Sequence, residues 1–115
     1  MIRVYIAGPF TGDVEANCAA AIDAGERVRQ AGHLPFIPHL YRAWHERHPA
    51  SYEEAMALCF AEVSRCDVLL RMPGASPGAD REVKHAIERG IPVVYNVESI
   101  TSVAVSAPLC WGCQP

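Results

Sequence analysis

Two glycine-containing segments carry the residues that could bind or transform a small molecule. The second of these segments, residues 74–78, places Gly74, Ser76 and Gly78 directly ahead of a predicted helix. Unpaired amides and the positive end of the helix dipole attract anions, so this segment could hold a phosphate. An ordinary turn with an N-cap, in which Ser76 or Asp80 accepts from the first helix amides, explains the same residues.

Glu82 falls in the first turn of that predicted helix, next to the apolar residue Val83. Its carboxylate can therefore lean over the edge of a sheet toward the other glycine segment, and we expect the helix dipole to favour the ionised form. An ionised carboxylate beneath a sugar can attack the anomeric carbon and form a covalent glycosyl intermediate. Glutamate early in a helix is also common for electrostatic reasons alone.

The first glycine segment, residues 7–12, reads Ala-Gly-Pro-Phe-Thr-Gly. Gly8, Pro9 and Phe10 follow an apolar run, and glycine lets a ligand approach the backbone closely. A Gly-Pro turn that only reverses the chain is the simpler interpretation of this segment taken alone. We predict that both segments contribute to one binding site.

The elements that would position these residues alternate along the chain. Strands are predicted at residues 2–6, 34–37, 68–70 and 91–95, helices at residues 14–31, 52–63 and 78–89, and an ordered loop at residues 39–48. This alternation predicts an α/β flavodoxin-like fold with three layers and a parallel sheet of four or five strands. Right-handed crossovers give the strand order 2-1-3-4 and bring both glycine segments to one edge.

Local signals mark where the predicted helices begin and end. Asp13 is an N-cap candidate, and Gly32 supplies a stop for the first helix. Ser51 followed three residues later by Glu54 is a capping box for the second helix. Residues 98–115 have no clear period, so we expect either a short helix or a packed arm there.

Length and composition limit the classes of protein that fit. A chain of 115 residues, half of them hydrophobic, fits a single domain. The net charge of −3 and the scattered Lys and Arg residues argue against nucleic-acid binding. No apolar run approaches the roughly 20 residues of a membrane span or forms a signal segment, so we expect a cytoplasmic protein with reduced thiols.

No metal or cofactor is predicted. The histidines lack the spacing of a zinc motif with a companion glutamate. Cys110 and Cys113 form a C-x-x-C pair near the end of the chain, but no second pair accompanies it, which disfavours a zinc or redox role.

Several motifs together resemble the nucleoside 2-deoxyribosyltransferase-like superfamily. They are the run Tyr-Ile-Ala-Gly-Pro-Phe at residues 5–10, the pair Cys66 and Asp67 entering the third strand, and Ser76-Pro-Gly78 with Glu82 six residues after the serine. The resemblance extends to about residue 95. Residues 35–39, 71–74 and 76–82 look like a bacterial and phage branch labelled DUF4406, and nucleoside 5′-monophosphate N-glycosidases are similar too.

The resemblance implies a role for individual residues. Glu82 matches the nucleophile, Tyr5 the tyrosine of the first strand, and Ser76 the serine that contacts the 5′-phosphate. The superfamily's aspartate that handles the proton of the leaving base, eight residues ahead of Asp67, is Cys59 here. Such acid help is typically worth about 10²–10⁴-fold in rate. Asp67 and Asp80 are the possible substitutes, but Asp67 begins the third strand and should lie at the far end of the sheet, so Asp80 is the predicted one.

Two functions follow from the resemblance. The first is an N-glycosidase or deoxyribosyltransferase that cleaves the base–sugar bond of a nucleoside or nucleoside 5′-monophosphate. The second, kept open by Cys59, is a non-catalytic nucleotide-binding module of the same fold. Because sites in the superfamily are completed by a neighbouring subunit, we expect a homodimer or larger even oligomer, with residues 41–44 as a candidate contact.

Overall fold

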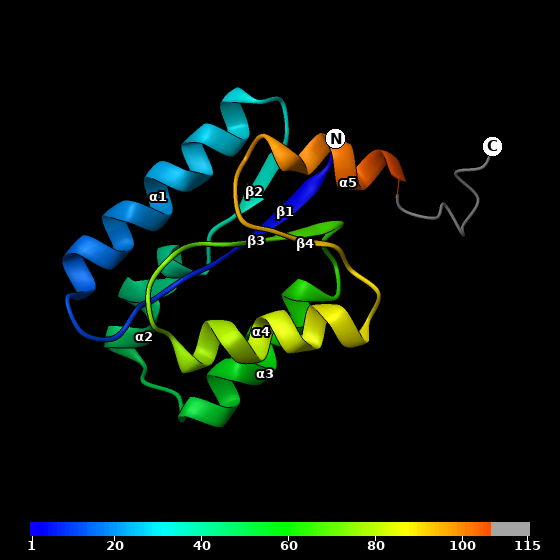
Figure 1. Ribbon diagram of the computed structural model, residues 1–115. Helices are drawn as coiled ribbons and strands as arrows, with labels where there is room; N and C mark the ends of the chain where they lie inside the picture. The colour runs from blue at the N-terminus through cyan, green and yellow to red at the C-terminus, as the bar shows by residue number, and fades with distance from the viewer. Residues whose placement is uncertain (107–115) are drawn as a thin grey trace.

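Four parallel strands form the central sheet of the computed structural model, which describes residues 1–106 (Figure 1). They are β1 (Arg3–Ala7), β2 (Leu34–Phe36), β3 (Val68–Arg71) and β4 (Val93–Val94). Their order is β2-β1-β3-β4, which confirms the predicted order. The described residues form no fifth strand.

Helices cover both faces of the sheet, so the fold is a flavodoxin-like three-layer α/β fold (Figure 1). They are α1 (Val14–Gln30), the 3-10 helix η1 (Pro38–Tyr41), α2 (Arg42–Arg47), α3 (Tyr52–Val63), α4 (Pro77–Glu88) and α5 (Ser99–Ser106). None of the helices within residues 1–106 is long and apolar enough to cross a membrane.

Side chains of β1 alternate between the two faces, as the two-residue period of a strand requires. Val4 and Ile6 pack in a cluster with residues of α1 and α5. Tyr5 and Ala7 point to the other face, where they pack with residues of α3 and α4. These four side chains are fully buried, so every residue of β1 except the exposed Arg3 contributes to one of the two cores.

The predicted caps of two helices are confirmed. The Asp13 carboxylate accepts a hydrogen bond from the amide of Ala16 over 3.1 Å. At α3, the Ser51 hydroxyl accepts from the amide of Glu54 over 3.1 Å, and the Glu54 carboxylate accepts from the amide of Ser51 over 2.9 Å. These bonds satisfy helix amides that would otherwise lack partners.

Two predicted segments differ in the structure. Residues 39–48 are not a loop, because η1 and α2 occupy them. Pro38 favours the first position of a helix, and an ion pair one turn apart joins Arg42 and Glu46 on α2.

The fourth strand is shorter than predicted and begins after Pro92, which has no amide to donate to a sheet. Of the tail, α5 confirms the short helix, whereas Cys110 and Cys113 lie outside the described residues.

Candidate active site

The two glycine segments meet at one edge of the sheet, as predicted. Ala7 pairs with Arg71 at the ends of β1 and β3, and the amide of Met72 donates to the Ala7 carbonyl over 2.8 Å. Beyond these strands, a Cβ atom added to Gly74 would lie 2.8 Å from Cγ of Pro9. Gly74 also has a φ of +112°, so both the contact and the backbone require glycine. Ligands bind at this carboxyl edge in open α/β sheets.

Tyr5 and Glu82 form a buried hydrogen-bonded pair beneath that edge. The Tyr5 hydroxyl donates to Oε2 of Glu82 over 2.7 Å. Tyr5 is fully buried and Glu82 is 6% exposed, although Glu82 belongs to the first turns of a helix. A hydrogen bond to a carboxylate is stronger than one between neutral groups, so this contact orients the Glu82 side chain.

Cys59 on α3 lies against the same pair. Its thiol is within hydrogen-bonding reach of both the Tyr5 hydroxyl and the Glu82 carboxylate. Burial raises the pKa of the Cys59 thiol to about 11, so the thiol carries its proton at neutral pH. Cys59, at the position where the resemblance implies an aspartate, therefore lies beside the predicted nucleophile.

Burial also raises the pKa of Glu82, which corrects the expectation that the helix dipole would favour its ionised form. Hydrogen bonds from Tyr5 and Cys59 and the positive charge of Arg71 act in the opposite direction, but loss of hydration has the larger effect. The pKa of Tyr5 is raised well above its ordinary value, first by burial and then by the negative charge of Glu82. Tyr5 therefore donates a hydrogen bond as a neutral hydroxyl.

Ser76 is the N-cap of α4. Of the two interpretations of this residue, a phosphate ligand or an ordinary helix cap, the cap was the simpler one. Its hydroxyl oxygen accepts from the amide of Ala79 over 3.1 Å, and its carbonyl accepts from the amide of Asp80 over 3.0 Å. Pro77 occupies the first helical position and has no amide hydrogen. Among residues 77–80, only the amide of Gly78 therefore remains free for a ligand, while the Ser76 hydroxyl hydrogen can still point outward.

The two aspartates considered as acids lie in different places. Asp67 is at the far edge of the sheet, as expected, where its carboxylate accepts from the amide of Arg3 over 2.8 Å. Asp80 is near the site, but its carboxylate pairs with Arg71 over 2.9 Å and is 71% exposed. Asp80 is not among the groups that interact with Glu82. Its role as a substitute acid stays a prediction.

Two residues of the site were missed in the sequence. Arg71 is almost buried at the end of β3. His39 is 6% exposed, and its Nε2–H donates to the Pro9 carbonyl over 2.9 Å. Its ring also lies beside Phe10, with 6.0 Å between the ring centroids, so His39 holds the first glycine segment. Arg71 directly follows the predicted strand at residues 68–70, and His39 comes two residues after the predicted strand at residues 34–37. Their places at this edge of the sheet were the available signal.

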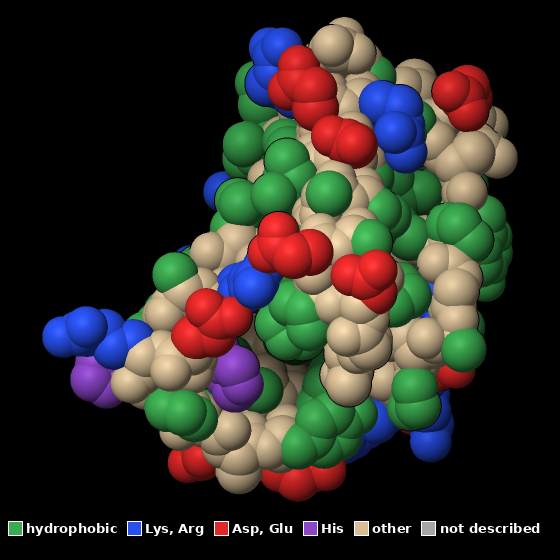
Figure 2. Space-filling view, turned by 90° about the vertical axis from the view of Figure 1, so that its left-hand side faces the viewer, with side chains coloured by type: hydrophobic (Ala, Val, Ile, Leu, Met, Phe, Trp, Pro, Cys, Tyr) green, Lys and Arg blue, Asp and Glu red, His purple; other side chains and the backbone are tan. Residues whose placement is uncertain are grey.

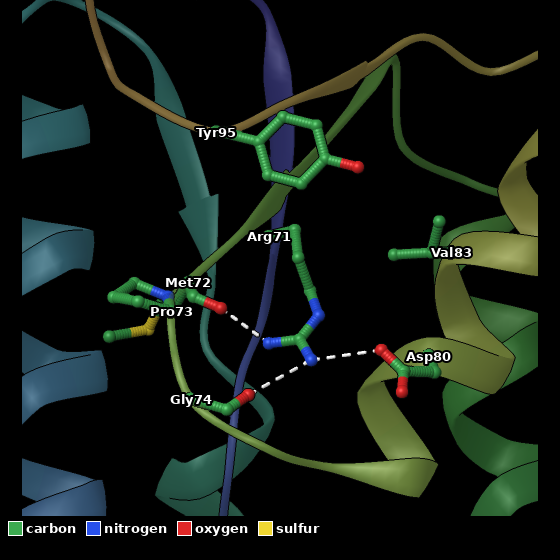
Figure 3. A pocket seen from close by; sticks show the side chains of 7 residues that line it. All are labelled: Arg71, Met72, Pro73, Gly74, Asp80, Val83 and Tyr95. Atoms are coloured by element: carbon green, nitrogen blue, oxygen red, sulfur yellow. Dashed lines mark hydrogen bonds and ion pairs between the residues drawn. The ribbon is translucent and has the colours of Figure 1, made fainter.

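A cavity of about 530 Å³ opens beside Arg71 (Figure 3). It is lined by Arg71, Met72, Pro73, Gly74, Asp80, Val83 and Tyr95. Tyr5 and Glu82 are not among the lining residues, so their hydrogen-bonded pair lies outside this cavity. A buried carboxylate with polar partners is a candidate reactive group, whereas a cavity only provides space.

An aromatic series connects Tyr5 with the surface. The ring of Phe36 stacks on Tyr5 with 5.6 Å between centroids, Tyr41 lies 5.9 Å from Phe36, and Trp44 lies 5.6 Å from Tyr41. Tyr41 and Trp44 are about half exposed. On the side of the molecule that carries α1 and α2, hydrophobic side chains are interspersed with both acidic and basic ones (Figure 2).

Within residues 1–106, no group of three His, Cys, Asp or Glu side chains lies close enough together to hold a metal ion. The free thiols there belong to Cys18, Cys59 and Cys66.

Comparisons with known proteins address the fold and the family. The crystal structure of a conserved protein from Enterococcus faecalis V583 is similar, with a TM-score of 0.67 and 20% sequence identity over 96% of this chain and 77% of that chain. This likeness supports the flavodoxin-like fold alone. A search of curated proteins finds no match. The model of a domain of unknown function, DUF7768, matches residues 2–96. The chain therefore belongs to the DUF7768 family.

Proposed function

We propose that this protein is an N-glycosidase or deoxyribosyltransferase that cleaves the base–sugar bond of a nucleoside or nucleoside 5′-monophosphate, with Glu82 as nucleophile. The observation that carries the proposal is the buried hydrogen bond between Tyr5 and Glu82 at the ligand-binding edge. Burying a carboxylate costs free energy, and its direct partners are a hydroxyl and a thiol rather than a cation. Such a costly arrangement in this place favours a catalytic purpose.

The proposed reaction has two steps. An oxygen of Glu82 attacks the anomeric carbon, and the bond to the base breaks with its electron pair leaving on the base nitrogen, which takes up a proton. Water, or a second base in a transferase, then attacks the same carbon and releases Glu82. Tyr5 orients the carboxylate throughout, because its hydroxyl is fixed 2.7 Å away.

Substrate binding is assigned to the two glycine segments. The hydroxyl of Ser76 and the amide of Gly78 are the donors proposed for a 5′-phosphate at the start of α4. Gly8, Pro9 and Phe10 would lie against the sugar and base, held by the contact between His39 and the Pro9 carbonyl. We place this reaction in the cytoplasm, with no metal or cofactor taking part.

The proton for the leaving base has two candidate sources. Asp80 is the predicted one, but reaching the base requires its carboxylate to leave Arg71. Cys59 lies beside Glu82 and carries a proton, although a thiol with a pKa near 11 is a weak acid at neutral pH. Acid help from Cys59 would therefore be weaker than help from a carboxyl at the same position.

A non-catalytic nucleotide-binding module is the alternative, and Cys59 is the observation that favours it. A module of this kind would keep the edge formed by Gly8, Ser76 and Gly78 but would release no base. The test is incubation of the protein with nucleosides and their 5′-monophosphates, followed by chromatography for free base. Release by the wild type that disappears in Glu82→Gln but persists in Glu26→Gln supports the enzyme. Binding without release by the wild type supports the module.

A further inference from the structure

Arg71 is a charged residue held almost out of solvent at the carboxyl end of β3. Its side chain is 11% exposed. One guanidinium nitrogen, Nη1, donates to the Met72 carbonyl, and Nη2 donates to the Gly74 carbonyl over 3.0 Å and to Asp80 over 2.9 Å (Figure 3). One guanidinium thus contacts both the segment after β3 and the first turn of α4.

The strand register places this cation on the same face as Tyr5. Tyr5 pairs with Leu69 across β1 and β3, and Arg71 lies two residues beyond Leu69. Residues two apart on a strand project from the same face, so Arg71 and Tyr5 both point toward α4. The positive charge of Arg71 acts on the Glu82 carboxylate and opposes the effect of its burial.

The contacts of Arg71 also connect the two glycine segments with the helix that carries Glu82. Gly74, whose carbonyl Arg71 binds, packs against Pro9 of the first segment. Asp80, the other partner, precedes Glu82 by two residues on α4. The planar guanidinium group of arginine has several N–H donors that point in fixed directions, so it can make these bonds at the same time. The ammonium group of lysine lacks this planar set of donors.

We propose that Arg71 is a positioning residue for Glu82, which fixes the segment between β3 and α4 and supplies the positive charge that favours the reactive, ionised carboxylate. This inference rests on the proposed function of Glu82. It also gives Asp80 a different role from the predicted one, because Asp80 holds Arg71 and partly offsets its charge. The groups that face Glu82 are Tyr5 from β1, Cys59 from α3 and Arg71 from β3.

Titration of the Glu82 carboxyl distinguishes this role from that of a simple clamp. If Arg71 were only a clamp, Arg71→Met would loosen α4, admit water and lower the pKa of Glu82. If its charge matters, Arg71→Met raises that pKa by roughly half a unit or more, about a threefold change in the ionisation constant. Asp80→Asn then lowers it, because the charge of Arg71 is no longer offset.

The experiment is carbon NMR of the full chain with labelled glutamate, with the Glu82 signal assigned from Glu82→Gln. Arg81→Met is the matched control. Arg81 lies on α4 next to Glu82, but its guanidinium pairs with the exposed Glu53. We expect no change of the Glu82 titration in this control. An unchanged or lowered pKa in Arg71→Met overturns the proposal.

Two further measurements cover the remaining outcomes. If Arg71→Met does not fold, a raised or unchanged Glu82 pKa in Asp80→Asn overturns the proposal, since the Asp80 carboxylate is mostly exposed. In base-release assays of Arg71→Met, the pH at which the rate is half-maximal should rise together with the pKa of Glu82 measured by NMR. Absence of base release by the wild type would overturn the proposed function and leave the titration result intact, so the two failures are distinguishable.

Discussion

Tyr5 and Glu82 are 77 positions apart in the chain, and their side-chain oxygens are 2.7 Å apart in the fold. The strand order makes this possible, because β1 lies next to β3 and α4 follows β3 across the same face. The pair is buried, so the behaviour of Glu82 depends on few neighbours, each of which can be changed separately.

Tyr5→Phe removes the hydroxyl that donates to Glu82. We expect the pKa of Glu82 to rise further and base release to fall, because the ionised carboxylate loses a hydrogen bond. The free energy of unfolding should fall by about 1–3 kcal/mol, as for other buried acceptors left without a donor. Tyr41→Phe, at a half-exposed tyrosine, is the control for stability and should leave the free energy of unfolding unchanged. Full activity in Tyr5→Phe would contradict the assigned role.

Cys59→Asp introduces the carboxyl that the resemblance implies, at a position beside Glu82. Two carboxyls so close cannot both ionise readily, so one would keep its proton and could pass it to the leaving base. We expect faster base release if the missing acid limits turnover, with Cys59→Ser as the size-matched control. An unchanged rate would mean that Asp80 or solvent already supplies the proton.

The pH dependence of stability follows from the raised pKa of Glu82. Its carboxyl is protonated in both states below its ordinary value of 4.5, so its stabilising effect is complete there. As the pH rises above 4.5, the unfolded chain ionises first, and the effect is lost by the time the pH passes the folded value. The free energy of unfolding of wild type relative to Glu82→Gln should therefore fall over this range.

Chemical denaturation at several pH values measures this difference. Glu26→Gln is the comparison with the opposite sign, because the hydrogen bond from Arg29 lowers the pKa of Glu26. The contribution of Glu26 should be present above its ordinary pKa and decrease as the pH falls through the folded value. A wild-type advantage over Glu82→Gln that grows with pH would refute the assignment of a raised Glu82 pKa.

Ser76→Ala tests the proposed phosphate site. It removes both the N-cap of α4 and a hydroxyl donor, so stability should fall by about 1 kcal/mol and the preference for monophosphates over nucleosides should shrink. Ser51→Ala removes the N-cap of α3 at a similar cost and should leave that preference unchanged. Calorimetric titrations with a nucleoside and its monophosphate measure this preference. Equal affinities of the wild type for the two ligands would exclude a phosphate site at Ser76.

We predict a homodimer or larger even oligomer, with Tyr41 and Trp44 at the contact because both are large, half exposed and in ring contact. Sedimentation should give a multiple of 12.5 kDa at micromolar concentration, and Trp44→Ser should reduce it. Leu58→Ser is a control at an exposed apolar residue on α3. A wild-type mass of 12.5 kDa would count against the prediction.

The sequence alone determined the sheet order, the binding edge and most of the elements. Their signals are local or follow from connection rules: the capping box of Ser51 and Glu54, the glycines that end helices, and the right-handed crossovers that bring Gly8 and Gly74 together. The resemblance singled out Tyr5 and Glu82 separately, and the fold brings their side chains into hydrogen-bonding contact.

Only the tertiary structure decided what surrounds Glu82. Its burial reverses the pKa direction that the helix dipole alone would give, because loss of hydration depends on packing by α3 and the sheet. The pairing of Arg71 with Asp80 likewise depends on how α4 lies over β3, which no local pattern encodes. Helix α2 was missed since six residues are too few to show a period. Short-range preferences set the elements, whereas solvent exclusion and charge pairing arise only when distant segments pack together.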